Sequence, residues 1–476
     1  MSEVKFGEGF PPKTVAIVGV SRTEQMRHPG YTGSRLFRIL REAGFKGSVY
    51  PVNPKADMID GVKAYPSVTA IPERLDLVTI GVPSTEVPQV LEDCVAAGAL
   101  NVQILTSGFG ETGEVQGSEL ERAIRDIALR TGLRVIGPNC MGFQIPSVKM
   151  KMFEEVELIR GPVAFVSQSG GHARIFLMQG PHFGIGFSKV ISYGNALVLD
   201  AIDFLEYLST DRETGIICMY LEGIRKGGGE LMKLVKQINA RKPVIIWKGG
   251  LTSPGARAAS SHTGSLAGNK QIWDAFFKQT GVIKVNSIDE MADVTMTLLH
   301  LKPSSGRRVA VIGAGGGDSV STGDICVNEG LEMPPISTKT MTELLKFVSL
   351  VNQGVSNPLD VPSVFGDLST LRRTFETLAA DPLIDIIILH VGAEYFPDIW
   401  GSRMDEFSEC ISSASRKDQG AKPIILAVTN ESGRSAPEKY VRELVKKGIP
   451  AYTSLERACR ALNRFASYNE FQAAKG

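Results

Sequence analysis

Cysteine is scarce in this chain, with six residues among 476 and no Cys-x-x-Cys pair. Scattered single cysteines argue against a disulfide framework and fit reduced thiols in a cytosol. Histidine also numbers only six, and no second histidine lies near His262 to suggest a metal-binding pair. We therefore expect no metal site in this chain.

Long apolar runs and an excess of one charge are also missing. No run approaches the roughly 18 apolar residues that span a bilayer, and the first residues, MSEVKFGEGFPPK, lack the layout of a signal peptide. Lysine and arginine number 52 against 51 aspartate and glutamate, which gives no support for a polyanion-binding surface. We expect a cytoplasmic protein that binds neither membrane nor nucleic acid.

Short apolar runs that end in Gly, Pro, Ser or Asn are abundant, and amphipathic helical patterns separate them. KTVAIVG, FVSQSGG and RRVAVIG each open a block of this kind. Continuous apolar strands that alternate with helices predict parallel sheets covered on both faces. At about 150 residues per domain, the length fits three such domains. We predict an α/β protein with three doubly wound domains at residues 1–145, 146–302 and 306–470.

Two glycine-rich turns follow predicted strands and lead into predicted helices. SQSGG spans residues 167–171, and GAGGGDS spans residues 313–319. A helix that starts after such a turn directs backbone N–H groups at an anion. One such turn is more often only a tight turn, but two in one chain favour phosphate binding. The predicted phosphate-binding residues are Ser167, Gln168, Ser169, Gly170, Gly171, Gly315, Gly316, Gly317, Asp318 and Ser319.

A nicotinamide-dependent oxidoreductase is one alternative for the first block. The VGVSR segment at 18–22 follows the first predicted strand, but it is not a GxGxxG fingerprint. Lys55, in YPVNPK, stands where such enzymes have an acidic residue. A lysine there suits a phosphate, although NPK also fits an ordinary turn. These features disfavour the oxidoreductase.

His262 lies among small residues in AASSHTGSLAG, residues 258–268, which we expect to form a flexible loop. Glu222 follows another predicted strand. A carboxylate that binds one imidazole nitrogen fixes the tautomer and makes the other nitrogen a better nucleophile. Helix N-termini would stabilise a phosphate on that nitrogen by about 1 kcal/mol or more each. The residues alone leave two interpretations open: a phosphohistidine, or a histidine that completes a turn.

Motifs along nearly the whole chain resemble those of the nucleoside-diphosphate-forming acyl-CoA synthetases, relatives of succinyl-CoA synthetase. They are GPNCMG (137–142), FVSQSGG (165–171), YLEG (220–223), WKGGLTSPGARAASSHTGSLAG (247–268), GAGGG (313–317) and SNPLDV (356–361). Their order is that of the α-subunit type. This resemblance implies a Rossmann-like CoA-binding domain followed by two flavodoxin-like domains.

The resemblance also implies the chemistry: a carboxylic acid, CoA and ATP interconvert with acyl-CoA, ADP and phosphate through an acyl phosphate. His262 would be the transient phosphohistidine and Glu222 the carboxylate that holds it. CoA would lie over the first domain, and its thioester end would approach the second. The implied CoA-binding residues are Gly19, Val20, Ser21, Arg22, Asn53, Pro54, Lys55, Val82, Pro83, Ser107, Gly108 and Asn139.

The family also needs an ATP-grasp domain to exchange phosphate with ADP. The three predicted domains use the whole length, so no segment remains for it. We therefore expect a separate ATP-grasp β-subunit that carries ATP or ADP with Mg²⁺, in an α2β2-type hetero-oligomer. The alternative is a CoA-binding sensor that has lost the synthetase chemistry.

Some residues depart from the family pattern or invite other interpretations. His172 and Arg174 stand where small apolar residues are usual, which is either neutral drift or an altered acid specificity with Arg174 facing a carboxylate. We interpret Glu111 as a solvated loop charge. Cys140 has no basic partner nearby in sequence, so we expect a buried structural thiol.

Overall fold

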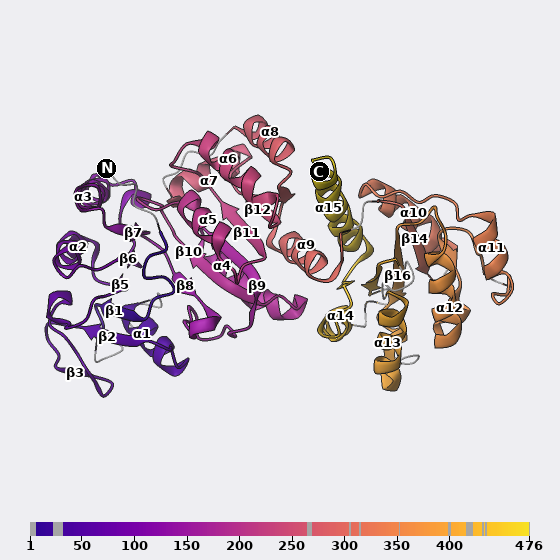
Figure 1. Cartoon of the computed structure of the whole chain (residues 1–476), viewed down its shortest axis with the longest axis horizontal. Helices are drawn as coiled ribbons and strands as arrows, with labels where there is room; N and C mark the ends of the chain where they lie inside the picture. The colour runs from indigo at the N-terminus through magenta and orange to yellow at the C-terminus, as the bar shows by residue number, and fades with distance from the viewer. Residues whose placement is uncertain are drawn as a thin grey trace. The chain divides into compact units, whose positions relative to one another are not determined.

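The computed structural model describes residues 6–21, 32–263, 269–303, 306–313, 316–351, 353–397, 401–415, 422–430, 433 and 436–475, apart from the side chains of residues 260–263, 316 and 402. Within these residues the chain is α/β, with three predominantly parallel sheets and interleaved helices (Figure 1). The predicted fold class is confirmed.

The first sheet has the strand order β2-β1-β5-β6-β7, all parallel. Its strands are β1 (Thr14–Val18), β2 (Ser48–Val52), β5 (Leu77–Ile80), β6 (Asn101–Ile104) and β7 (Arg134–Ile136). A small antiparallel hairpin, β3 (Met58–Ile59) with β4 (Val62–Lys63), follows β2. The helices of this block are α1 (Gly33–Glu42), α2 (Val87–Ala96) and α3 (Val115–Thr131).

The second sheet has the order β13-β12-β11-β9-β10-β8. Its strands are β8 (Gly142–Gln144), β9 (Arg160–Ser167), β10 (Phe187–Ser192), β11 (Ile216–Leu221), β12 (Val244–Lys248) and β13 (Ile283–Val285). Its helices are α4 (Gly170–Gln179), α5 (Ala201–Thr210), α6 (Gly228–Asn239), α7 (Ser253–Thr263) and α8 (Lys270–Thr280). Strand β8 is antiparallel to β10 and joins this sheet although it precedes residue 146.

The third sheet has the order β15-β14-β16-β17-β18, again all parallel. Its strands are β14 (Val309–Gly313), β15 (Leu359–Asp360), β16 (Ile386–Gly392), β17 (Ile424–Thr429) and β18 (Ala451–Tyr452). Its helices are α9 (Ile288–His300), α10 (Gly316–Asn328), α11 (Thr338–Leu344), α12 (Leu368–Ala379), α13 (Met404–Ala414), α14 (Pro437–Lys446) and α15 (Leu455–Ala473).

The parallel strands of all three sheets follow one order. In the first and third sheets the first strand lies between the second and the third, and in the second sheet β9 lies between β10 and β11, so the winding reverses beside β1, β9 and β14. In open α/β sheets, ligands bind at the carboxyl ends of the strands that flank this reversal. The topology therefore places candidate sites after β1 and β5, after β9 and β11, and after β14 and β16.

Side-chain alternation covers both faces of the second sheet, as a doubly wound fold requires. On β9, Phe165 contacts Phe176 of α4 with the ring centroids 4.9 Å apart. Its neighbour Val166 turns to the opposite face and joins a buried cluster that also contains Phe204 of α5. Burial of large apolar side chains of this kind stabilises each by about 1.5–3 kcal/mol.

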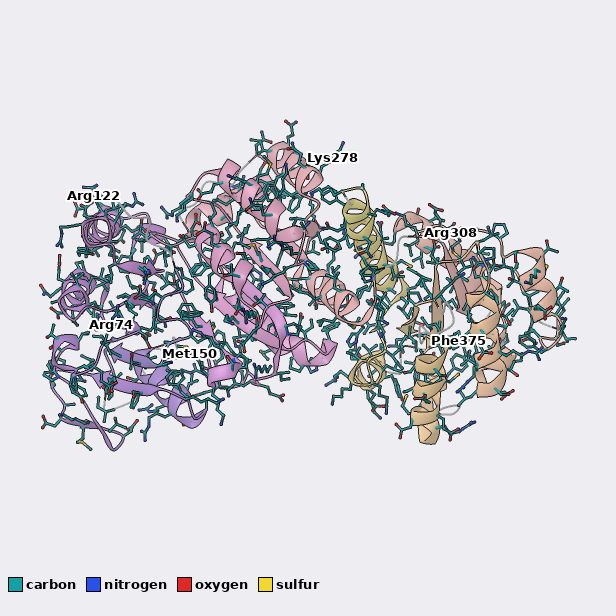
Figure 2. All side chains as sticks on the ribbon, viewed as in Figure 1. Arg74, Arg122, Met150, Lys278, Arg308 and Phe375 are labelled. Atoms are coloured by element: carbon teal, nitrogen blue, oxygen red, sulfur yellow. The ribbon has the colours of Figure 1, made fainter. Side chains whose placement is uncertain are left out.

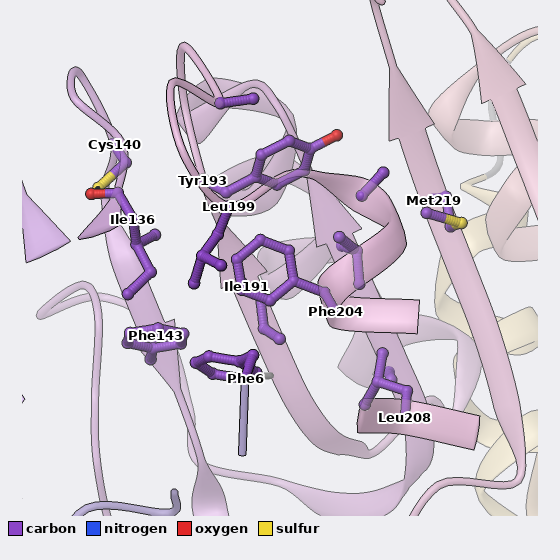
Figure 3. Close-up of a cluster of buried hydrophobic side chains, with 14 of the residues drawn as sticks. Phe6, Ile136, Cys140, Phe143, Ile191, Tyr193, Leu199, Phe204, Leu208 and Met219 are labelled. Carbon is purple, nitrogen blue, oxygen red and sulfur yellow. Dashed lines mark hydrogen bonds between the residues drawn. The ribbon is translucent and has the colours of Figure 1, made fainter. Parts of the chain in front are cut away.

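That buried cluster is continuous between the first and second sheets (Figure 3). Phe6 and Phe143 stack near Tyr193 and Phe204, while Ile136 comes from β7 of the first sheet. The contacts divide the chain into two compact units: residues 1–181 with 186–288, and residues 182–185 with 289–476. The first unit therefore contains both the first and the second sheet.

Candidate functional site

Three glycines meet at the carboxyl edge of the first sheet, where its winding reverses. Gly19 follows β1 with φ +91°, a conformation that favours glycine. A Cβ atom on Gly19 would lie 2.5 Å from the carbonyl oxygen of Gly81, which follows β5. A Cβ on Gly81 would lie 2.9 Å from the backbone nitrogen of Gly33, the first residue of α1. The missing side chains let the helix start approach the two strand ends.

The predicted CoA-binding segments come together at this edge. The Nδ2 of Asn53 donates to the carbonyl oxygen of Val20 at 2.6 Å, which joins the segments after β1 and β2. Thr106 Oγ1 donates to the carbonyl oxygen of Val82 at 2.6 Å, which joins the segments after β5 and β6. Most of the predicted CoA-binding residues are accessible at this edge. The exposed ones are Pro54, Lys55, Pro83 and Ser107, the partly buried ones are Gly19, Ser21, Asn53, Val82, Gly108 and Asn139, and the buried one is Val20. Arg22 lies outside the described residues.

Glu111 is not a solvated loop charge, so our interpretation of it from the sequence is wrong. It lies in the short helix η3 (Gly110–Thr112), and its Oε1 accepts hydrogen bonds from the backbone N–H groups of Gly108 at 2.7 Å and Phe109 at 3.2 Å. Its Oε2 accepts a hydrogen bond from Asn195 Nδ2 at 2.6 Å. The carboxylate thus connects the loop after β6 with the segment after β10.

The SQSGG turn lies after β9, at the reversal of the second sheet. Ser169 is the N-cap of α4, and its Oγ accepts a hydrogen bond from the backbone N–H of His172 at 3.2 Å. Ser167 Oγ donates to the carbonyl oxygen of Ser169 at 2.7 Å and accepts from its N–H at 3.1 Å. Gly170 is so close to Met141 that a Cβ would lie 2.2 Å from the Met141 Cγ. These contacts fix the start of α4, where backbone N–H groups could meet an anion.

Gln168 and Glu222 lie side by side at the ends of β9 and β11. The buried Gln168 Oε1 accepts hydrogen bonds from the backbone N–H groups of Glu222 and Gly223, the second at 2.9 Å. Lys248, at the end of β12, donates from Nζ to the carbonyl oxygen of Glu222 at 2.8 Å. Three neighbouring strands therefore hold the backbone of Glu222, and its side chain is buried.

Burial shifts the pKa values of the groups beside Glu222. It lowers the pKa of Lys248 to about 8, an effect that the Glu222 charge partly opposes. Burial, followed by the Glu222 charge, raises the pKa of Tyr220 well above its usual range. The rings of Tyr220 and Trp247 pack against the His172 ring, whose centroid lies 4.2 Å from that of Tyr220 in a tilted arrangement and 4.7 Å from that of Trp247 in an edge-on arrangement. His172 is thus part of an aromatic cluster on this sheet.

The segment that carries His262 begins as a helix, which corrects the predicted loop. Residues 253–263 form α7, so His262 lies in its last turn. The hydroxyl of Thr252 accepts a hydrogen bond from the backbone N–H of Gly255 at 3.2 Å, which caps the start of the helix. Helix α7 lies against η3, the short helix that contains Glu111. The side chain of His262 and all of residues 264–268 lie outside the described part.

The second predicted phosphate turn lies after β14, at the reversal of the third sheet. Helix α10 begins at Gly316. In its first turn, Gly317 and Asp318 are exposed and Ser319 is partly buried. Gly315 and the exposure of Gly316 lie outside the described part of the chain. Asp318 places a carboxylate in the first turn of α10. That charge already uses the favourable field of the helix start and would repel a phosphate, so Asp318 itself is a poor phosphate ligand.

Arg174 and Cys140 both have partners within the chain. Arg174 forms an ion pair with Glu155, so the carboxylate that it faces in this structure is internal. Cys140 is buried and its Sγ donates to the carbonyl oxygen of Ile104 at 3.3 Å. Burial also raises the pKa of this thiol to about 12, which disfavours the reactive thiolate, and the predicted burial of Cys140 is confirmed.

Among the described residues, no cluster of three or more His, Cys, Asp or Glu side chains could hold a metal ion. In the same part of the chain, no helix is both long and apolar enough to cross a membrane.

Family models identify the class of the first two sheets. Residues 13–146 match a CoA binding domain, and residues 160–298 match a succinyl-CoA ligase like flavodoxin domain. The first match covers the glycine-lined edge after β1, and the second covers Gln168, Glu222 and α7.

Relatives of known name match nearly the whole chain. The α-subunit of ADP-forming acetate–CoA ligase II of Pyrococcus furiosus is 37% identical over 95% of this chain and 95% of its own. The ADP-forming acetate–CoA ligase I of Archaeoglobus fulgidus is 35% identical over 98% of this chain, which spans 64% of that longer protein. A dinucleotide-forming acetyl-coenzyme A synthetase of Ca. Korarchaeum cryptofilum, solved with phosphate and ADP, is 31% identical with a TM-score of 0.83, over 97% of this chain and 96% of its own. The chain belongs to the family of ADP-forming acyl-CoA synthetases.

Proposed function

We propose that this chain is the α-type subunit that interconverts a carboxylic acid, CoA and ATP with acyl-CoA, ADP and phosphate. Its CoA site would be the glycine-lined edge of the first sheet, with the residues predicted there. Three domains with limits at residues 145, 146, 302 and 306 remain part of this proposal, although β8 pairs with the second sheet and nearly all of α9 belongs to the unit of the third sheet. The relatives named for acetate support a small carboxylic acid as substrate.

The reaction requires two transfers in this chain. In the acyl-CoA-consuming direction, a phosphate oxygen attacks the thioester carbonyl, the C–S bond breaks, and CoA leaves as the thiol after taking a proton. An imidazole nitrogen of His262 then attacks the phosphorus of the acyl phosphate, the P–O bond breaks, and the carboxylate leaves. Glu222 would orient the imidazole and stabilise the positive charge that develops on it.

The phosphate would next pass from His262 to ADP on a separate ATP-grasp β-subunit. The α-subunits among the relatives support such a partner. Mg²⁺ would accompany the nucleotide there, because this ion is usually held by one or two carboxylates together with the phosphates of the nucleotide. An α2β2 assembly in the cytoplasm remains part of this proposal.

The observation that best supports the proposal is the position of Glu222. Hydrogen bonds from β9 and β12 fix its backbone, and it lies at the sheet edge where α4 begins. A phosphate held at the α4 start would thus lie on the same edge as the carboxylate that orients the histidine. The turn before α10, in the other unit, remains our second proposed phosphate-binding turn.

Labelled phosphate tests the proposal directly. The purified chain, incubated with acetyl-CoA and labelled phosphate, should acquire an acid-labile, base-stable label on His262. ATP formation from acetyl-CoA, ADP and phosphate should require an added ATP-grasp subunit. Absence of label in the presence of bound CoA would favour the sensor alternative, and sustained ATP formation by the chain alone would refute the need for a partner.

A further inference from the structure

Glu111 uses both carboxylate oxygens as acceptors at the thioester end of the proposed CoA site. Oε1 accepts hydrogen bonds from the backbone N–H groups of Gly108 and Phe109, at 2.7 and 3.2 Å, in the loop after β6. Oε2 receives Asn195 Nδ2 at 2.6 Å from the segment after β10. Gly108 has φ +101°, so this carboxylate holds the loop in a conformation that few other residues adopt. The carboxylate therefore fixes the shape of the loop and its distance from the second sheet.

Asn195 extends this network toward the other half of the site. Its Oδ1 accepts from Asn139 Nδ2 at 3.4 Å, and its backbone N–H donates to the carbonyl oxygen of Pro138 at 3.0 Å. Its carbonyl oxygen accepts from Arg225 Nε at 3.0 Å, and Arg225 lies three residues after Glu222. Helix α7, which carries His262, lies against the short helix of Glu111. The loop at the thioester end is therefore connected to the Glu222 segment and adjoins the histidine helix.

We propose that Glu111 is a positioning residue for acyl transfer between CoA and phosphate, an inference that rests on the proposed function. It holds the Ser107–Gly108 turn against the second sheet, so that the thioester carbonyl meets a phosphate bound at the start of α4. The first transfer needs this placement because phosphate oxygen and thioester carbon must approach within about 3–3.5 Å. The second transfer, from acyl phosphate to His262, does not involve CoA.

A carboxylate is required because both of its oxygens accept. In Glu111→Gln the amide can still accept from the two N–H groups, but its NH₂ then faces Asn195 Nδ2, and two donors oppose each other. If Asn195 turned over, its NH₂ would oppose the Nδ2 of Asn139 instead. The variant therefore weakens the link between the loop and the second sheet at nearly constant volume.

Two phosphate donors separate the two transfers in the full-length chain. Labelled phosphate with acetyl-CoA requires both transfers, whereas labelled acetyl phosphate requires only the second. We expect Glu111→Gln to label roughly 10- to 100-fold more slowly from acetyl-CoA, the range that misplacement of about 1 Å produces. Its labelling from acetyl phosphate should stay within about twofold of the unsubstituted chain.

A charge swap provides the matched control. Asn195→Asp alone places two carboxylates face to face and should also lose labelling from acetyl-CoA. When Glu111→Gln and Asn195→Asp are combined, the new amide at position 111 donates to one oxygen of the new carboxylate at position 195. The other oxygen of that carboxylate still accepts from Asn139. The double variant should therefore recover most of the acetyl-CoA-dependent rate.

The outcomes distinguish this inference from the proposed function. If the unsubstituted chain takes label from neither donor, the proposed function fails and this inference with it. If that chain is labelled and Glu111→Gln equals it with acetyl-CoA, only this inference is wrong. Equal losses of labelling rate with both donors would show a general structural role for Glu111 and overturn this inference. A double variant that is labelled as slowly as the single variants would overturn it too.

Discussion

The ammonium group of Lys248 donates a hydrogen bond to the backbone carbonyl oxygen of Glu222, with 2.8 Å between Nζ and the oxygen. Lys248 ends β12 and Glu222 follows β11, so the bond joins two adjacent strand ends at the proposed phosphate site. The same group also donates to the carbonyl oxygen of Gly249 and lies 5.3 Å from the ring centre of Trp273. A buried cation thus supports the carboxylate segment through its backbone.

The lowered pKa of Lys248 predicts that stability increases with pH. The folded-state pKa is about 8 against an ordinary 10.5, so between these values the unfolded chain binds more protons than the folded chain. The free energy of unfolding should therefore rise from pH 8 toward pH 10. Denaturant unfolding across this range measures the free energy of unfolding of the unsubstituted chain and of Lys248→Met. The free energy of the unsubstituted chain minus that of the variant should increase with pH. A difference independent of pH would contradict the prediction.

His262→Ala should abolish turnover and leave the fold intact. Alanine is the best helix former, so the last turn of α7 loses no helix propensity. The covalent carrier of phosphate, however, is gone. Circular dichroism and thermal unfolding should match the unsubstituted chain within a few degrees, while synthetase activity with the partner falls to background. Substantial turnover by this folded variant would remove His262 from the mechanism.

Glu222→Gln should lower the yield of phosphoenzyme without unfolding the chain. The amide is nearly isosteric and the backbone bonds to Gln168 and Lys248 remain, but the charge that favours the attacking imidazole is lost. Phosphoenzyme per chain is the quantity to measure, and we expect a decrease of roughly tenfold or more. The control is Glu230→Gln, at an exposed position of α6, which should behave as the unsubstituted chain.

Gly19→Ala should destabilise the chain and weaken CoA binding, because its Cβ would lie 2.5 Å from the Gly81 carbonyl oxygen. Gly61→Ala is the matched control: Gly61 also has a positive φ, +77°, but a Cβ there meets nothing within 4 Å. Gly61→Ala should lower the free energy of unfolding by about 1 kcal/mol, and Gly19→Ala should lower it by about 1–3 kcal/mol more. If both variants lost the same free energy of unfolding, the close approach of Gly19 to Gly81 would not restrict the side chain at position 19.

Lys55→Ala should weaken CoA binding by about 1 kcal/mol, or roughly fivefold, because an exposed charge pair with a phosphate contributes little more than that. Calorimetry on the full chain measures the change. Lys278→Ala, an exposed lysine of α8 (Figure 2), is the control and should leave the affinity unchanged. An affinity unaffected by the loss of Lys55, or a preference for NADH over CoA, would contradict this assignment.

The periodicity of the sequence determined much of the fold. Runs such as KTVAIVG and RRVAVIG form β1 and β14, and both glycine-rich turns lead into helices, because burial on two faces demands continuous apolar strands. The antiparallel β8 could not be predicted, since three residues carry too little pattern to show their partner. The helix at residues 253–263 was missed because Ser, Thr and Gly residues are weak helix formers by themselves.

By itself, the sequence determined the three-block α/β architecture, the family motifs and the buried character of Cys140, all of which depend on local pattern and composition. Only the tertiary structure decided how Gln168 holds Glu222 and how Glu111 binds Asn195, residues 84 apart in the chain. The strand order brings Gln168 and Glu222 to one edge of the second sheet, whereas Glu111 and Asn195 follow strands of two different sheets that pack together. Whether a carboxylate is solvated or bound depends on that arrangement, because its partners come from other strands.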